Sequence, residues 1–123
     1  MGLDMYLTGE RCFSGVRYDE PGLIGERYRL GYWRKHPNLH GFIVNQIADV
    51  VDDCQEITLS REQLQTIITA VEKERLPTTT GFFFGVSSGN EKERDLQILR
   101  DAVTWLESPD EEAWRFVTYQ ASW

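Results

Sequence analysis

Both ends of this chain carry the alternating pattern of a half-buried β-strand. Residues 1–7 read Met-Gly-Leu-Asp-Met-Tyr-Leu, and residues 114–123 read Trp-Arg-Phe-Val-Thr-Tyr-Gln-Ala-Ser-Trp. Side chains that alternate in this way place one face of a strand on a core and the other face in water. Because chain ends fray unless packing holds them, aromatic residues as far as Trp123 predict a packed last strand. We therefore expect one closed domain over residues 1–123, with its first and last strands paired in the middle of a sheet.

The residues between the two ends predict an α+β domain. In chain order we expect a loop at 14–25, a strand at 26–33, a helix that starts at His36, Pro37 and Asn38 and ends at Asp52 and Asp53, a strand at 55–59, and a strand or loop at 78–89. Ser60 with Gln63 forms a capping box before an apolar helical stripe, and Asn90 with Glu93 begins a third helix that Pro109 stops. This order predicts a mostly antiparallel sheet with about three helices packed on it.

Composition places the chain among soluble globular proteins. Apolar residues make up 41% of it and charged residues 27%, and apolar runs such as Phe82–Phe84 are too short to span a membrane. No basic stretch followed by an apolar segment opens the chain, so we expect no secretory signal and a cytoplasmic protein. Cys12 and Cys54 lie in no zinc-binding spacing, and we expect reduced thiols, no structural metal and no cofactor.

The net charge of −7 is concentrated in the second part of the chain. Residues 1–45 carry a net charge of +1, and residues 46–123 carry −8. Nucleic-acid binding draws its energy mainly from Lys and Arg side chains that neutralise phosphates, so the acidity argues against direct nucleic-acid binding. The charge permits a different interaction, in which an acidic surface meets a basic protein partner.

A basic and aromatic segment stands out in this acidic chain. Four Lys or Arg side chains and three aromatic rings fall within ten residues, and a functional interpretation of them is a phosphate- or nucleotide-facing patch. The candidate ligand-binding residues are Tyr32, Trp33, Arg34, Lys35, His36 and His40. The alternative is an edge strand whose rings enter the core and whose cations face solvent. A pocket lined by Trp33, Arg34 and His40 would favour a ligand. A buried Trp33, with Arg34 paired to an aspartate at 52–53, would make the segment structural.

The signals for metal binding and catalysis are weaker. His36 and His40 are four residues apart and would share a helix face, but a half-buried core histidine is the simpler interpretation of His40. Cys54 follows an expected helix end, where the dipole disfavours a thiolate, so we interpret it as a packing residue. The glycine-containing turn at 85–90 lacks the P-loop and Rossmann motifs. We therefore predict no catalytic residue and no metal ligand.

Motifs spread over the whole chain point to one known group of proteins. They are Met1–Leu7, Gly31–Lys35, His40, Val51–Cys54, Leu76–Thr78, Gly81–Gly85 and Tyr119–Trp123. Together they resemble a family of small uncharacterised proteins encoded in bacteriophages and prophages, and the chain departs from the family pattern at Gly41 and Ala121. The resemblance implies a phage or prophage origin and the cytoplasm of a bacterial host. It carries no established activity, so it assigns no catalytic residue.

Two classes of function fit these features. The first is a non-enzymatic accessory protein that binds a host or phage protein, for example to inhibit a host defence or nucleic-acid-handling protein. Its contact surface would be the acidic half, centred on Asp52, Asp53, Glu72, Glu74, Glu91, Glu93, Asp110, Glu111 and Glu112. The second is a small-molecule binding protein or enzyme that uses the Tyr32–His40 segment on a phosphate or nucleotide, with His40 as acid or base. A structural or assembly role without a ligand is a third possibility, and the oligomeric state is open.

Overall fold

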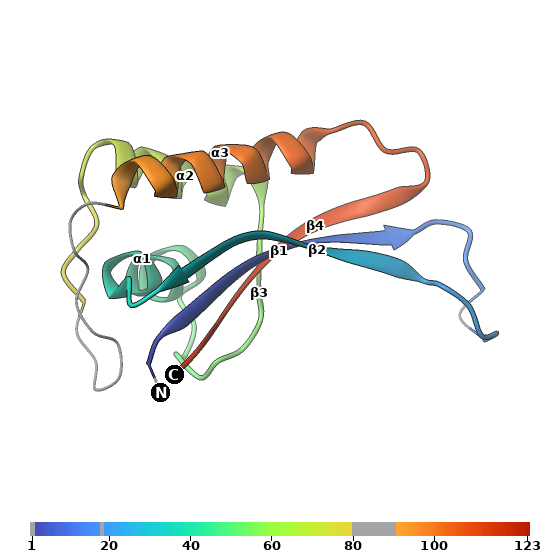
Figure 1. Cartoon of the computed structure of the whole chain (residues 1–123), viewed down its shortest axis with the longest axis horizontal. Coiled ribbons are helices and arrows are strands. Elements are labelled where there is room, and N and C mark those ends of the chain that lie inside the picture. The colour runs from blue at the N-terminus through green and yellow to red at the C-terminus, as the bar shows by residue number, and fades with distance from the viewer. Residues whose placement is uncertain (1, 18, 80–90) are drawn as a thin grey trace.

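The chain forms a four-stranded antiparallel sheet with helices on one of its faces (Figure 1). A computed structural model describes residues 2–17, 19–79 and 91–123. The strands are β1 (Asp4–Phe13), β2 (Gly25–Arg34), β3 (Ile57–Leu59) and β4 (Ala113–Ser122). The helices are α1 (Pro37–Gly41), the π-helix η1 (Phe42–Ala48), α2 (Arg61–Glu72) and α3 (Lys92–Glu107). This arrangement confirms the predicted α+β class.

The first and last strands occupy the middle of the sheet. The strand order is β2-β1-β4-β3, and every neighbouring pair is antiparallel. The ladder between β1 and β4 runs without interruption from the Asp4–Ser122 pair to the Phe13–Ala113 pair. Figure 1 shows the two chain ends side by side as a result. The predicted pairing of the terminal strands is confirmed.

The alternation in these strands places one face of the sheet in the core. Leu3, Met5 and Leu7 are buried, and so are Val117 and Tyr119 of the neighbouring strand β4, where Tyr119 pairs with Leu7. They belong to one hydrophobic cluster with the apolar faces of the helices, and α2 and α3 lie along this side of the sheet (Figure 1). Each such buried side chain stabilises the fold by about 1.5–3 kcal/mol.

The start of α2 follows its sequence signal closely. The Gln63 backbone N–H donates to Ser60 Oγ at 3.1 Å, and the Ser60 backbone N–H donates to Gln63 Oε1 at 2.8 Å. These reciprocal bonds confirm the capping box. The third helix begins at Lys92 after Glu91, which forms no side-chain cap. The expected cap Asn90 lies outside the described residues.

The first helix begins at Pro37 as predicted but ends earlier than expected. Its turns widen into the π-helix η1, and Asp49 stops it with a left-handed backbone, at φ 51°. The expected end at Asp52 and Asp53 is therefore wrong. Asn38 lies inside the helix rather than capping it, and its side chain accepts a hydrogen bond from the Thr79 backbone N–H at 2.9 Å.

The expected strand before α2 is short. The strand expected at 55–59 is present as β3, Ile57–Leu59. Residues 80–89 of the expected strand or loop lie outside the described residues. Within the described parts of the chain, no helix combines the length and apolar character needed to cross a membrane.

Gly31 allows α3 to approach the sheet closely. The register between β1 and β2 shifts after the Leu7–Gly31 pair, because Leu30 is an extra residue that forms a β-bulge. A Cβ atom on Gly31 would lie 2.3 Å from Cγ2 of Ile98 in α3. Because Gly31 has no side chain, Ile98 of α3 can pack directly against the backbone of β2.

Gly31→Ala should destabilise the protein by about 1–3 kcal/mol, because the added methyl group overlaps Ile98 and forces repacking. Gly22→Ala is the matched control, since no atom lies within 4 Å of a Cβ at that position, and its effect should stay within about 0.5 kcal/mol. Urea unfolding followed by circular dichroism measures both. Equal unfolding midpoints for the two variants would contradict this account of the helix–sheet spacing.

Candidate functional site

The face of the sheet opposite the core carries no helix of the described residues. The strand register aligns Tyr6 with Tyr32 and Gln120, and it aligns Thr8 with Arg29 and Thr118. Because side chains alternate along each strand, these residues share one face. We call this surface the open sheet face, and it is formed by Asp4, Tyr6, Thr8, Glu10, Cys12, Arg27, Arg29, Tyr32, Arg34, Trp114, Phe116, Thr118 and Gln120.

A hollow of about 320 Å³ lies in the open sheet face. It is lined by Tyr6, Thr8, Arg27, Tyr28, Arg29, Glu56, Thr118 and Gln120. The guanidinium carbon of Arg29 lies 4.6 Å from the centroid of the Tyr6 ring, which is a cation–π contact. Arg27 is held by carboxylates instead, with Nε 2.9 Å from Glu10 and Nη2 3.3 Å from Glu56.

Asp4 organises one end of this face. The Tyr32 hydroxyl donates to Asp4 Oδ1 at 2.5 Å, and this bond raises the pKa of Tyr32 above its ordinary value because it stabilises the protonated phenol. Arg34 Nε lies 3.9 Å from the same oxygen. The Tyr32 ring packs on Tyr6 with a centroid distance of 5.4 Å. The rings and charges at this end are therefore held in place by neighbours on the same face.

Two aromatic rings stand exposed at the other end of the face. Trp114 is 67% exposed and Phe116 is 39% exposed, opposite Cys12 and Glu10 in β1. Large apolar side chains grouped in water are typical of contact surfaces.

The core face receives other residues of the predicted basic and aromatic segment. Trp33 is buried, and its Nε1–H donates to Asp95 Oδ1 at 2.7 Å. His36 Nε2 lies 2.8 Å from the second oxygen of Asp95. All three side chains are buried, so one carboxylate in α3 joins that helix to β2 and to the start of α1.

His40 lies in the core between a phenol and a carboxylate. Its Nδ1 is 2.6 Å from the Tyr119 hydroxyl, and its Nε2 is 3.0 Å from both oxygens of Asp52. Burial, with the charge of Asp52 adding to it, raises the pKa of Tyr119 well above its ordinary value. The phenol therefore keeps its proton, and the His40 imidazole lies between a hydroxyl group and a carboxylate. This geometry agrees with the interpretation of His40 as a core histidine.

The structure thus separates the six candidate ligand-binding residues. Tyr32 and Arg34 lie on the open sheet face, Trp33, His36 and His40 lie in the core, and Lys35 is exposed in the turn after β2. Arg34 approaches Asp4 rather than an aspartate at 52–53. His36 and His40 contact different carboxylates and are 4% and 1% exposed, so neither imidazole presents itself to a substrate in solvent. No cluster of three or more His, Cys, Asp or Glu side chains suited to a metal occurs among the described residues.

The nine acidic residues proposed as a partner surface are dispersed. At the end of α2 and just after it, two of them pair with residues of α3, Glu72 with Arg100 at 3.4 Å and Glu74 with Lys92 at 3.7 Å. Asp53 precedes β3, Glu91 and Glu93 lie at the start of α3, and Glu111 and Glu112 lie in the turn before β4. Asp52 lies beside the end of β4 and Asp110 beside its start, so the two carboxylates are at different ends of that strand. These residues do not form one continuous surface.

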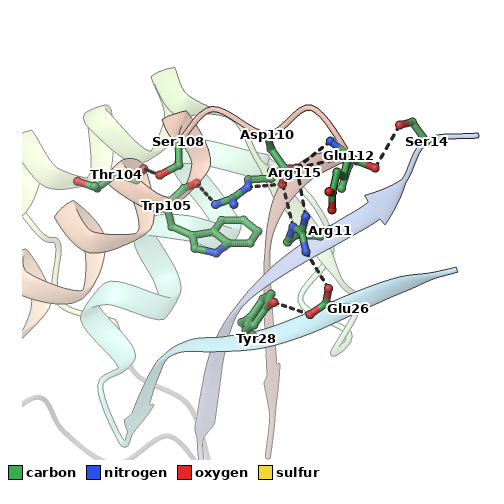
Figure 2. Close-up of polar contacts among 11 residues, drawn as sticks. Arg11, Ser14, Glu26, Tyr28, Thr104, Trp105, Ser108, Asp110, Glu112 and Arg115 are labelled. Atoms are coloured by element: carbon green, nitrogen blue, oxygen red, sulfur yellow. Dashed lines mark hydrogen bonds and ion pairs between the residues drawn. The ribbon is translucent and has the colours of Figure 1, made fainter. Parts of the chain in front are cut away.

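Asp110 is held within the fold and is not presented as part of an acidic contact surface. Figure 2 shows its carboxylate between two arginines, with Arg11 Nε and Arg115 Nε each donating to Oδ2 at 2.8 Å. The side chain is only 7% exposed, and its Oδ1 also accepts the backbone N–H groups of Glu112 and Ala113. The hydrogen bonds from Arg11 and then Arg115 hold the pKa of Asp110 well below its usual range. Asp110 is therefore a structural residue that shapes the turn.

We call Asp110, Arg11 and Arg115 the Asp110 cluster, and its two arginines also contact residues of neighbouring elements (Figure 2). Arg11 also pairs with Glu26 of β2 at 2.7 Å, and Glu26 accepts the Tyr28 hydroxyl at 2.5 Å. Arg115 donates to the Trp105 backbone oxygen at 2.8 Å and lies over the Trp105 ring, 4.8 Å from its centroid. The cluster thus joins the end of α3 to β1, β2 and β4.

Sequence reasoning missed Tyr6, Arg29 and Thr118 as members of a site. The alternating pattern of the first strand could have identified part of this site, because it places Tyr6 and Thr8 on the same face. The register that brings Arg29 beside them depends on the bulge at Leu30, which no local pattern indicates.

Trp33→Phe should destabilise the protein by at least about 1 kcal/mol, because Asp95 loses a buried hydrogen-bond donor and the smaller phenyl ring leaves part of the volume of the indole empty. Trp114→Phe is the control at an exposed tryptophan, with an expected change within about 0.5 kcal/mol. Urea unfolding by circular dichroism compares them. A Trp33→Phe variant as stable as the control would show that Asp95 does not depend on this donor.

Asp110→Asn should lower stability at neutral pH, with a pH dependence that follows from the depressed pKa. Because the folded pKa lies below the unfolded value of about 3.9, the stabilisation is complete above the unfolded value and is lost as the pH falls through the folded pKa. The difference in urea midpoint between wild type and Asp110→Asn should therefore be constant near neutral pH and shrink below about pH 4. The control is Glu111→Gln in the same turn. If the Asp110→Asn difference followed the same pH profile as the Glu111→Gln difference, the result would argue against the two-arginine site.

No protein-family model matches the chain, and neither a curated protein nor a solved structure matches it.

Proposed function

We propose that this protein is a binding protein that acts through protein–protein contact, with the open sheet face as its contact surface. The observation that carries the proposal is a sheet face that combines aromatic rings with arginines and that no helix of the described residues covers. Trp, Tyr and Arg contribute most of the binding energy at many protein interfaces. Arg29 is already stacked on Tyr6, and Tyr32 is already bonded to Asp4, so these side chains lose little freedom on binding.

The charge of the face favours a protein partner over a nucleic acid. Its arginines, Arg27, Arg29 and Arg34, are matched in number by three neighbouring carboxylates: Asp4, Glu10 and Glu56. A nucleic-acid surface needs an excess of cations to neutralise phosphates, and this face has none. Rings with mixed charges are typical of protein interfaces.

The face, rather than the edge, is the proposed contact. β2 is an edge strand, but its charged side chains and the bulge at Leu30 oppose the addition of another strand. Arg94 Nη2 also donates to the Tyr32 carbonyl at 2.7 Å, which occupies one backbone acceptor of β2.

The resemblance to phage and prophage proteins supports a bacterial host protein as the partner, in the accessory role described above. The alternative, a phosphate or nucleotide site over Tyr32–His40, gains no support from the geometry because those residues divide between two faces. The acidic half remains a source of long-range attraction for a basic partner rather than a contact patch.

The partner is identified by placing a photo-crosslinking amino acid at Thr8 and capturing the crosslinked host protein. The double variant Trp114→Thr and Phe116→Thr should then bind the identified partner at least about 30-fold more weakly, because it removes two exposed rings while keeping strand propensity. Val51→Thr is the control, since Val51 is 75% exposed but lies in the loop before β3. Unchanged affinity of the double variant would reject the open sheet face as the contact surface.

A further inference from the structure

The hollow in the open sheet face brings aromatic, hydroxyl and charged side chains together in one place. Its volume of about 320 Å³ lies at the small end of the range for ligand sites, so it suits a single side chain rather than a large cofactor. The charged residues that line it are Arg27, Arg29 and Glu56. The lining therefore carries one excess positive charge within a chain of net charge −7.

Of the two arginines that line the hollow, Arg29 is the one that can form an ion pair with an incoming anion. Arg27 already pairs with Glu10 and Glu56. Arg29 forms no ion pair with any residue in the described part of the chain, and its guanidinium group rests on the Tyr6 ring. A guanidinium group held against a ring presents its N–H donors in a fixed orientation, so it binds a planar anion with little loss of freedom.

We infer that the hollow receives a carboxylate side chain from an extended segment of the protein partner, with Arg29 donating two parallel hydrogen bonds to it. The inference rests on the proposed function, because a protein bound to the open sheet face presents the carboxylate. Thr8 and Thr118 are directly opposite each other in β1 and β4, and both line the same hollow with hydroxyl groups. One negative charge matches the single excess positive charge of the lining.

A phosphate group fits this hollow less well than a carboxylate. A phosphomonoester carries nearly two negative charges at neutral pH, and Glu56 in the lining and Glu10 behind Arg27 would repel the second. The hollow lies in a face formed by neighbouring strands rather than in a closed cavity. A peptide segment laid across the sheet therefore reaches Arg29 without a rearrangement of the fold.

The first test uses blocked tripeptides and the NMR signals of the arginine Nε–Hε groups. The peptide acetyl-Gly-Glu-Gly-amide should shift the Arg29 signal in a saturable manner, and its Gln analogue should act at least about tenfold more weakly, because a neutral amide forms no charge-assisted pair. The Glu peptide should lose its effect in Arg29→Gln and keep it in Arg17→Gln, an exposed arginine outside the face. Three results would overturn the inference: no shift at tens of millimolar peptide, equal shifts with the Gln analogue, or inorganic phosphate saturating the signal at a lower concentration than the Glu peptide.

The second test separates this inference from the proposed function. Once the partner is identified, Arg29→Gln should reduce its affinity at least about tenfold, with Arg17→Gln as the control. If Trp114→Thr with Phe116→Thr weakens binding and Arg29→Gln does not, the carboxylate site is refuted while the contact surface stands. If neither variant weakens binding, the proposed function itself is refuted.

Discussion

The antiparallel pairing of β1 with β4 is the constraint on which the rest of the structure depends. Its uninterrupted ladder fixes which side chains of the two central strands face the helices and which face the opposite side. A slip of one residue would move Leu3, Met5 and Leu7 out of the core and bring Tyr6 and Thr8 into it. One register therefore determines both the hydrophobic core and the open sheet face, and neither could change without the other.

The sequence contained enough information for the α+β class, the central pairing of the terminal strands and the Ser60 capping box. These features follow from hydrophobic periodicity and from local hydrogen bonds, which can be recognised in short stretches. The end of the first helix could not be predicted in the same way. Its π-helical turns and the left-handed Asp49 have no clear local signature, whereas Asp52, the expected end, is held by His40 after the chain has already left the helix.

The candidate site was harder to predict because cross-strand register determines it. Cations and rings that are adjacent in the sequence suggested one patch, but neighbours in a strand point to opposite faces, so Tyr32 and Trp33 serve different surfaces. The shift at Leu30 then decides that Arg29 lies across from Thr8, on the face of Tyr6. Asp110 shows the same limit, since its partner Arg11 comes from the opposite end of the chain. Side-chain partners that distant carry no local pattern.

The central position of β4 also governs when this fold can form during synthesis. β4 leaves the ribosome after every other described element, so the β1–β2 hairpin and the helices must wait for the strand that joins them to β3. Until then one edge of β1 lacks its backbone partners, and the apolar residues beside it are exposed to chaperones and to other nascent chains. Closing so long a loop is slow relative to local pairing. The sheet is therefore completed only after β4 has emerged, and a product that stops before Ala113 has no route to the native arrangement.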